Sequence, residues 1–225
     1  MIILKPSFSI LSQETEIELA KKIERAGRTC YNSEDLITDS SCLSFVQRMA
    51  KSGHEAMLEH ASISVLFTCD RGVTHEIVRH RVASYAQEST RYCNYLKDKF
   101  GSSVSFIDIE GGMGLDKSME KLSMEAKALI YEEWAQACLD AESHYLKMIE
   151  LGASPQMARS VLNNSTKTEI VCTFNIREWR HFIKLRAIGV TGAPHPQMIE
   201  LTSPLFDYLC EVYPSLFADL VKSVS

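Results

Sequence analysis

Apolar side chains recur with two different periods along the chain, and each period predicts one kind of element. Ile63, Val65 and Phe67 occupy every second position, which is the period of a strand with one buried face. The N-terminal stretch MIILKPSFSIL begins with apolar residues, which are interpreted as a first strand. On this basis we predict a strand that runs into a loop within residues 1–11, and further strands over residues 62–67, 103–109 and 168–175.

Between the strands, the apolar positions follow the helical period and the flanking residues suit helix ends. Thr15 and Glu18 have the spacing of a capping box. Ser154 followed by Pro155 is typical of a helix start, and Gly152 is expected to end the preceding helix. Predicted helices begin at Thr15, at Ser40 or Ser41 (ending by Gly53) and at Ser154, cover 72–83, 116–151 and 176–186, and resume near Pro196, with GGMG (111–114) as a loop.

Strands and helices interleave without the regular alternation that a parallel sheet requires. We therefore expect an α+β fold in which helices pack a small mixed or antiparallel sheet, as one domain over residues 1–225. A chain of 225 residues is long enough to bury a substantial core.

Composition narrows the class of protein. Hydrophobic residues make up 45% of the chain and charged residues 24%, as in ordinary globular proteins. The formal net charge of −5 argues against binding nucleic acid through its phosphate backbone. The seven cysteines include no CxxC pair, which favours reduced thiols in a cytoplasmic protein over disulfides or a zinc ribbon. No signal peptide and no membrane-spanning run are predicted.

Two pairs of histidines resemble the zinc-protease motif HExxH, but neither has its spacing. His75 and His80 are five positions apart, which turns one about 140° from the other on a helix. His54 and His60 fail similarly, so no metal is expected. The chain also contains no phosphate-binding P-loop motif and no GxSxG.

The segment RHRVASYAQESTRY, Arg79–Tyr92, is the richest cluster of hydrogen-bond donors in the chain. It is net positive within an acidic protein, and arginine forks with serine hydroxyls suit phosphate groups. These residues alone favour an anionic ligand such as a nucleotide. They leave open a simpler interpretation, in which the cations decorate a helix C-terminus and stabilise its dipole.

The same segment, with seven residues between RHR and Ser89 and with x-Arg-Tyr after Ser89, resembles the signature of the flavin-dependent thymidylate synthases. Further blocks resemble that family in its order along residues 28–200. They are Arg28–Tyr31, Gly53–Glu55 with Glu59 and His60, Ala158-Arg159 with Leu162, Asn175 and Arg177 followed by Leu185 and Arg186, and His195 with Gln197.

The resemblance implies a homotetramer whose active sites are shared between subunits. It implies bound FAD, with NADPH as reductant, and methylation of dUMP to dTMP with methylenetetrahydrofolate as carbon donor. Carried over residue by residue, it also assigns two sets of contacts. The expected cofactor-binding residues are His54, Ala56, Glu59, Arg79, His80, Arg81, Gln87, Asn175, Ile176, Arg177, His181 and His195. The expected dUMP-binding residues are Glu76, Arg79, Gln87, Glu88, Ser89, Thr90, Arg91, Arg159 and Arg186.

Arg186 is the expected catalytic residue. A cation beside the N3 and carbonyl edge of uracil stabilises the N3-deprotonated ring and raises the electron density at C5. No enzyme nucleophile is then required. The rival is a covalent route through Ser89, which would need a neighbouring base such as His80.

Several positions depart from the commonest pattern of the family. Ala56 replaces a frequent Thr, Glu76 a frequent Gln, and His181 a frequent Asn, while Ala86-Gln87-Glu88 replaces Asn-Glu-x. The stretch 188–194 also looks longer than usual. These changes bear on single contacts and on affinity, and they leave the arginines in place.

Two functions of other classes remain as alternatives. The first is a non-catalytic flavin- or nucleotide-binding regulator that keeps the phosphate-binding residues. The second is an RNA-binding module that combines RHR with Tyr85, Tyr92 and Tyr95, against which the acidic composition counts.

Overall fold

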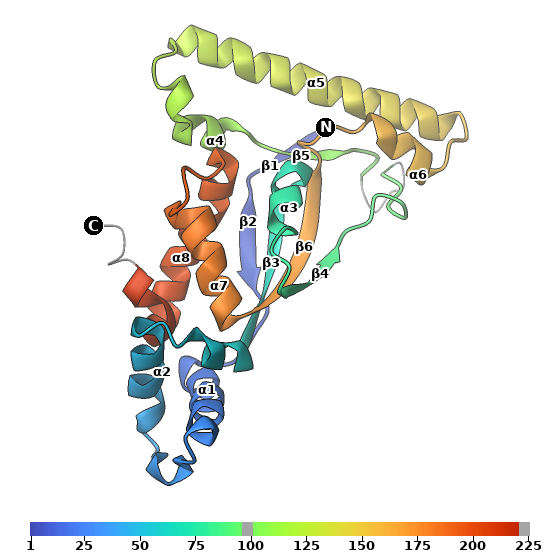
Figure 1. Cartoon of the computed structure of the whole chain (residues 1–225). Coiled ribbons are helices and arrows are strands. Elements are labelled where there is room, and N and C mark those ends of the chain that lie inside the picture. The colour runs from blue at the N-terminus through green and yellow to red at the C-terminus, as the bar shows by residue number, and fades with distance from the viewer. Residues whose placement is uncertain (96–100, 221–225) are drawn as a thin grey trace. The chain divides into compact units, whose positions relative to one another are not determined.

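The computed structural model describes residues 1–95 and 101–220, and its strands form two small sheets (Figure 1). In the two-stranded sheet, β1 (Ile2–Leu4) pairs in parallel with β5 (Ser105–Ile107), with Ile2 opposite Ser105. The four-stranded sheet has the order β2-β3-β6-β4. Its strands are β2 (Ser7–Ile10), β3 (Ser62–Asp70), β6 (Lys167–Asn175) and β4 (Ala83–Gln87).

Residues 1–11, predicted as a strand that runs into a loop, form two strands instead, because β1 and β2 belong to different sheets. Lys5 and Pro6 lie between them, and a proline has no N–H with which to continue a ladder of hydrogen bonds. The strand predicted over 103–109 forms, but only over 105–107. β3 and β6 match their predictions, with Ile63, Val65 and Phe67 fully buried.

The chain divides into two compact units. The first comprises residues 1–7, 67–79 and 86–170, and the second comprises residues 8–66, 80–85 and 171–225, of which 221–225 lie outside the described residues. The boundary between Arg79 and His80 falls inside the RHR motif. The mixed α+β class with small sheets packed by helices is confirmed, whereas the single domain over 1–225 and the tetramer stay predictions.

In the first unit, the long helix α5 packs on a core around Phe106 and Tyr145. Its buried Glu142 accepts hydrogen bonds from the Ser103 hydroxyl and the Val104 N–H, and it pairs with the amino group of Met1. The other helical segments of this unit are short. The elements are α3 (Arg71–Ile77), α4 (Glu110–Leu115), η4 (Lys117–Met119), α5 (Met124–Glu150), α6 (Pro155–Ala158) and η5 (Arg159–Val161).

Three helix predictions in this unit need correction. GGMG is not a loop, because it lies within α4. The long helix begins at 124 rather than 116, since the side chain of Ser123 caps the N–H of Ala126. The helix predicted over 72–83 ends at Ile77, and the chain then turns into β4, where it adds a strand beside β6. Arg79–Arg81 therefore follow a helix instead of ending one.

The second unit is built on a cluster of aromatic side chains. Phe174, Trp179 and Phe182 are fully buried and contact one another. The predicted capping box of Thr15 and Glu18 is confirmed at the start of α1. The helices of the second unit are α1 (Glu16–Cys30), η1 (Glu34–Leu36), α2 (Ser41–Lys51), η2 (Glu55–His60), α7 (Ile176–Ile183), η6 (Lys184–Ile188), α8 (Pro196–Val212) and α9 (Pro214–Phe217).

The helix predicted over 176–186 changes form in its last turn. α7 ends at Ile183, and η6 continues it as a π-helix in which the Gly189 N–H reaches back to the Lys184 carbonyl. Gly189 ends this segment at φ 78°, and a Cβ there would lie 2.8 Å from the carbonyl oxygen of Gly192. Only glycine adopts this conformation without strain and also fits the space.

None of the helices in the described residues is both long and apolar enough to cross a bilayer. All seven cysteines lie in the described ranges, and none of them is joined in a disulfide there.

Candidate active site

In the first unit, a tight turn after β4 presents Ser89, Thr90 and Arg91. The Ser89 carbonyl accepts the N–H groups of Tyr92 and Cys93, and the Ser89 hydroxyl oxygen accepts the N–H of Arg91 at 3.3 Å. Thr90 is buried, and its hydroxyl accepts a hydrogen bond from Nη1 of Arg159 at 3.2 Å. This contact ties the turn to η5, although the two residues are 69 positions apart.

We call Ser89, Thr90, Arg91 and Arg159 the phosphate cradle. Both arginines are exposed residues, and the guanidinium of Arg91 lies over the ring of Tyr92, 5.4 Å from its centroid. Guanidinium forks beside hydroxyl and backbone donors form the kind of site that binds phosphate in two-pronged contacts. The structure thus brings together four of the residues predicted to bind dUMP.

Gln87 and Glu88, also predicted to bind dUMP, make contacts within the protein. The amide nitrogen of Gln87 donates to the hydroxyls of Thr74 (3.1 Å) and Thr168 (3.4 Å). Glu88 pairs with Lys167 at 3.1 Å and accepts the hydroxyl of Tyr95 at 3.3 Å. Burial and the Glu88 charge raise the pKa of Tyr95. Glu88, Tyr95 and Lys167 line a cavity of about 340 Å³ in this unit.

The remaining predicted dUMP ligands of this unit are Glu76 and Arg79. Glu76 lies in the last turn of α3, and Arg79 lies just after the helix ends. Glu76 is half-buried and Arg79 is exposed, and the Arg79 N–H bonds to the Glu76 carbonyl at 3.3 Å. The turn therefore fixes the backbone of Arg79, while its side chain is placed at the surface.

In the second unit, Arg186 lies in the π-helix and is fixed at two points. Its carbonyl accepts the hydroxyl of Thr202 on α8 at 2.8 Å, and its Nε donates to Nε2 of His80 at 3.2 Å. π-Helical turns are rare and frequently occur at functional sites, because they widen the helix locally and redirect a side chain. The side chain of Arg186 therefore does not continue the regular spacing of side chains along α7.

His80 connects Arg186 to a buried carboxylate. Its Nδ1 lies 2.8 Å from Oε1 of Glu178, and its ring packs against Phe174 and Phe182. Because Nε2 accepts from Arg186, the ring proton of a neutral His80 lies on Nδ1 and is donated to Glu178. Burial lowers the pKa of His80, and Arg186 acts in the same direction, while Glu178 opposes both.

His80, Glu178 and His181 have ligand atoms within 4.8 Å of one another, so they could hold a metal ion. This group was not predicted from the sequence, where the metal candidates were the cysteines and the histidine pairs with near-HExxH spacing. The two hydrogen bonds of His80 account for its distance from Glu178. The guanidinium of Arg186 on the same ring would oppose a second cation there.

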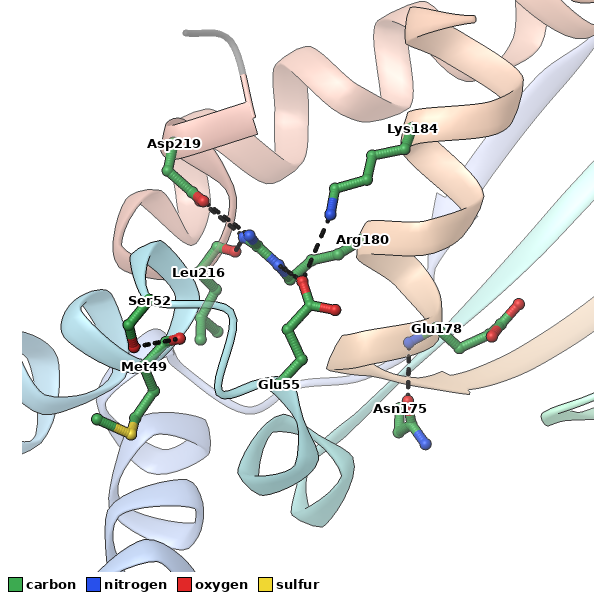
Figure 2. A network of polar contacts seen from close by, with 9 residues as sticks. All are labelled: Met49, Ser52, Glu55, Asn175, Glu178, Arg180, Lys184, Leu216 and Asp219. Atoms are coloured by element: carbon green, nitrogen blue, oxygen red, sulfur yellow. Dashed lines mark hydrogen bonds and ion pairs between the residues drawn. The ribbon is translucent and has the colours of Figure 1, made fainter. Parts of the chain in front are cut away.

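A second network on α7 holds the segment that carries the predicted flavin residue His54 (Figure 2). Arg180 is almost completely buried, and its fork pairs with both oxygens of Asp219 at 2.7 Å. Its Nε donates to Glu55, the first residue of η2, which Lys184 also contacts. The network connects α7, η2 and the residues after α9, and so fixes the backbone beside His54.

The residues predicted to bind FAD lie mostly in the second unit. Arg177 pairs with Glu59, while His54, Ala56, Arg81, His181 and His195 are exposed residues. Ile176 differs from the others, because its side chain is fully buried and its N–H donates to the Ala61 carbonyl. The Asn175 side chain caps the N–H of Glu178. Two donors at the start of α7 are therefore already engaged within the protein.

Sequence reasoning missed the residues that position the candidate site. Glu178 and Thr202 gave no motif signal, because a partner 98 or 16 positions away is visible only in the fold. Glu178 did carry one local sign. It stands in the first turn of a helix at an otherwise apolar position, where a carboxylate needs a partner.

Comparison with solved structures identifies the fold. The chain is similar to PolB, a UMP/dUMP methylase from Streptomyces cacaoi, in the structure bound with 5-Br dUMP. The TM-score is 0.80 at 18% sequence identity, over 99% of this chain and 97% of that one. The structure of the same methylase with 5-Br UMP gives a TM-score of 0.77 at 17% identity. At this level of identity the likeness concerns the fold.

Sequence comparison identifies the family. The family described as thymidylate synthase complementing protein matches residues 13–215. The flavin-dependent thymidylate synthase of Geobacter sulfurreducens is 33% identical over 72% of this chain and 66% of its own length. That of Mycobacterium tuberculosis is 32% identical over 88% and 78%, respectively. The chain therefore belongs to the flavin-dependent thymidylate synthase family, which makes it an enzyme of the methyltransferase class.

Proposed function

We propose that the protein synthesises dTMP by reductive methylation of dUMP, with FAD as bound cofactor, NADPH as reductant and methylenetetrahydrofolate as carbon donor. Family membership supports this reaction. The observation that carries the proposal is the placement of Arg186, a cation on a π-helical turn that is held by Thr202 and by the buried ring of His80.

The phosphate cradle would bind the 5′-phosphate of dUMP. Arg91 and Arg159 supply the charge, and Ser89 and Thr90 supply hydroxyl hydrogens, since their oxygens act as acceptors within the protein. The resemblance implies active sites shared between subunits. The cradle and Arg186 of one chain therefore need not act on the same dUMP molecule.

The exposed residues of the second unit suit the cofactor. Arg81, Arg177, His54 and His181 are cationic groups or hydrogen-bond donors of the kind that bind a dinucleotide pyrophosphate. Ala56 contributes no hydroxyl, and the buried Ile176 contributes no side-chain contact at the surface. When bound, FAD supplies the reducing equivalents for the methylation.

Arg186 is proposed to activate the pyrimidine. Its guanidinium carries five N–H donors, of which Nε is used by His80. The charge beside the uracil N3 and carbonyl edge would stabilise the deprotonated ring, so that electron density moves to C5. The protein supplies no attacking atom in this scheme.

The contacts of Ser89 favour this route over a covalent one. Its hydroxyl oxygen accepts the backbone N–H of Arg91. Among the described residues, no histidine or carboxylate is hydrogen-bonded to that hydroxyl, so Ser89 lacks the base that a serine nucleophile needs.

The test is turnover by the purified protein supplied with FAD. We expect a flavin absorbance spectrum that changes on addition of dUMP. NADPH oxidation should be stimulated by dUMP, and dTMP should form only when methylenetetrahydrofolate is present. A protein that is colourless and takes up no added FAD would overturn the proposal. Flavin binding without dTMP formation would support the non-catalytic regulator instead.

A further inference from the structure

Two hydrogen bonds form a chain from Glu178 through His80 to Arg186, and all three residues belong to the second unit. Arg186 can donate only to an unprotonated Nε2. The ring proton must therefore lie on Nδ1, and the carboxylate of Glu178, 2.8 Å away, is its acceptor. Nothing else placed on that nitrogen would favour this tautomer as strongly as an anion.

We propose that Glu178 is a positioning residue for the methylation reaction, which fixes the Nδ1–H tautomer of His80 and thereby holds Nε of Arg186 in place. This inference rests on the proposed function of Arg186. It extends that function to a carboxylate that makes no contact with Arg186 in the hydrogen bonds described, and it assigns His80 a role within the protein as well as toward the cofactor.

The surroundings of His80 make the chain rigid. The imidazole side chain is 3% exposed and that of Glu178 is 11% exposed. Phe182 meets the ring edge-on at 4.9 Å, and the backbone carbonyl of His80 accepts the hydroxyl of Tyr85. A side chain that is locked by packing holds its partner within the small tolerance that catalysis demands.

The chain of hydrogen bonds makes activity depend on the protonation of His80. The titratable or charged groups that face it are Glu178 and His181 on α7, Arg186 on η6 and Tyr85 on β4. Protonated His80 cannot accept from Arg186, so activity should fall as the pH drops through the pKa of His80. Since Glu178 raises this pKa and burial lowers it, removal of the carboxylate moves the acid limb to lower pH.

The decisive variant is Glu178→Gln, which keeps the size of the side chain and removes its charge. We expect kcat to fall about 10- to 100-fold, which is the scale for loss of a carboxylate that orients a functional histidine through a hydrogen bond. KM for dUMP should stay near its wild-type value, and the acid limb of the kcat profile should move to lower pH. A residue that only stabilises the fold would lower kcat through the fraction of active protein, but it would leave the position of the acid limb unchanged.

A double-mutant cycle separates action through His80 from a general effect on α7. In a His80→Asn background, Glu178→Gln should lower kcat no further, within about twofold for sites that do not couple otherwise. Asp219→Asn is the matched control, because it removes another carboxylate from a cation of the same helix. It should lower the unfolding temperature and leave the acid limb in place. Full additivity of the two losses in the cycle would overturn the proposal.

A measurement that does not depend on turnover tests the role of Glu178 independently of the proposed function. ¹⁵N spectra of the histidine-labelled protein, with the His80→Asn variant for assignment, report which ring nitrogen carries the proton. We expect Nδ1–H in the wild type and a shift toward Nε2–H in Glu178→Leu, which leaves that proton without its acceptor, whereas the amide oxygen in Glu178→Gln can still accept it. A wild-type protein that makes no dTMP but shows this tautomer refutes the function alone. An active protein with Nε2–H at His80 refutes the role of Glu178.

Discussion

Nη1 of Arg159 donates to the hydroxyl of Thr90 across 69 residues of sequence, which fixes an arginine of η5 on the turn after β4. The bond leaves the guanidinium attached to the buried side of the turn, while the residue as a whole is exposed. An arginine held in this way is oriented before its ligand arrives, and a ligand that binds it loses less side-chain entropy.

We predict that Arg159→Ala raises KM for dUMP about 10- to 100-fold, the range for a hydrogen bond to a charged group. Steady-state kinetics with dUMP and with deoxyuridine measure this. The defect should be confined to dUMP, since deoxyuridine has no phosphate for the cradle. Thr90→Val, which removes only the hydroxyl that orients Arg159, should have a smaller effect of the same kind. An equal loss with both substrates would assign Arg159 to the pyrimidine instead.

Arg186→Ala should abolish dTMP formation and leave FAD bound. Loss of one preorganised charge from a reacting site costs about 10²- to 10³-fold in kcat. Arg186→Lys should recover little, because an ammonium cannot donate to His80 and to the pyrimidine edge as a guanidinium fork does. Product formation and the flavin absorbance of each variant are the measurements. Turnover near that of the wild type in Arg186→Ala would refute the assignment.

The Arg180 network should contribute strongly to stability. Asp219→Ala leaves the buried Arg180 with Glu55 as its remaining carboxylate partner. The free energy of unfolding should fall by about 3 kcal/mol, as when one partner of a buried ion pair is removed. Lys184→Met is the control, because Lys184 is a more exposed partner at 3.5 Å and its loss should cost less than about 1 kcal/mol. Urea unfolding of both variants tests the difference.

The contribution of Asp219 should also depend on pH. Burial alone would raise its pKa, but the hydrogen bonds and charge of Arg180 outweigh burial and lower the pKa below the ordinary value of 3.8. A carboxyl whose pKa is lowered by folding stabilises the protein fully above its unfolded pKa. The stability difference between the wild type and Asp219→Asn should therefore be constant above about pH 5 and shrink as the pH falls below 4. A difference that grows toward low pH would contradict this reasoning.

Sequence patterns predicted the elements whose cause is local. The capping box of Thr15 and Glu18 and the alternation around Val65 both depend on neighbours within a few positions, and both predictions are confirmed. The end of α3 at Ile77 depends on β6, which pairs with β4, so the residues 78–83 alone did not reveal it. The π-helical turn at Arg186 likewise rests on Gly189 and on Thr202 of the following helix.

The residues of the candidate site also fall into those predictable from local sequence and those that depend on distant contacts. The arginines of RHR and of the cradle were visible in the sequence, because they belong to motifs that resemble those of the family. Glu178, which bonds to His80, and Asp219, which pairs with Arg180, were not predicted, since each acts through a contact made only after folding. Ile176 was predicted beside the cofactor on the strength of its motif, yet its side chain is fully buried.

The π-helical turn at Lys184–Ile188 has a consequence for how the chain tolerates insertions and deletions. Such a turn holds one residue more than an α-helix of the same rise. Deletion of one residue within it would restore a regular helix and rotate every later side chain by about 100°. Deletion of Leu185, for example, would leave every arginine of the chain in place and keep the order of all other residues. It would nevertheless alter which side chain contacts His80. The number of residues in this turn, and not only their identity, therefore determines whether Arg186 reaches His80.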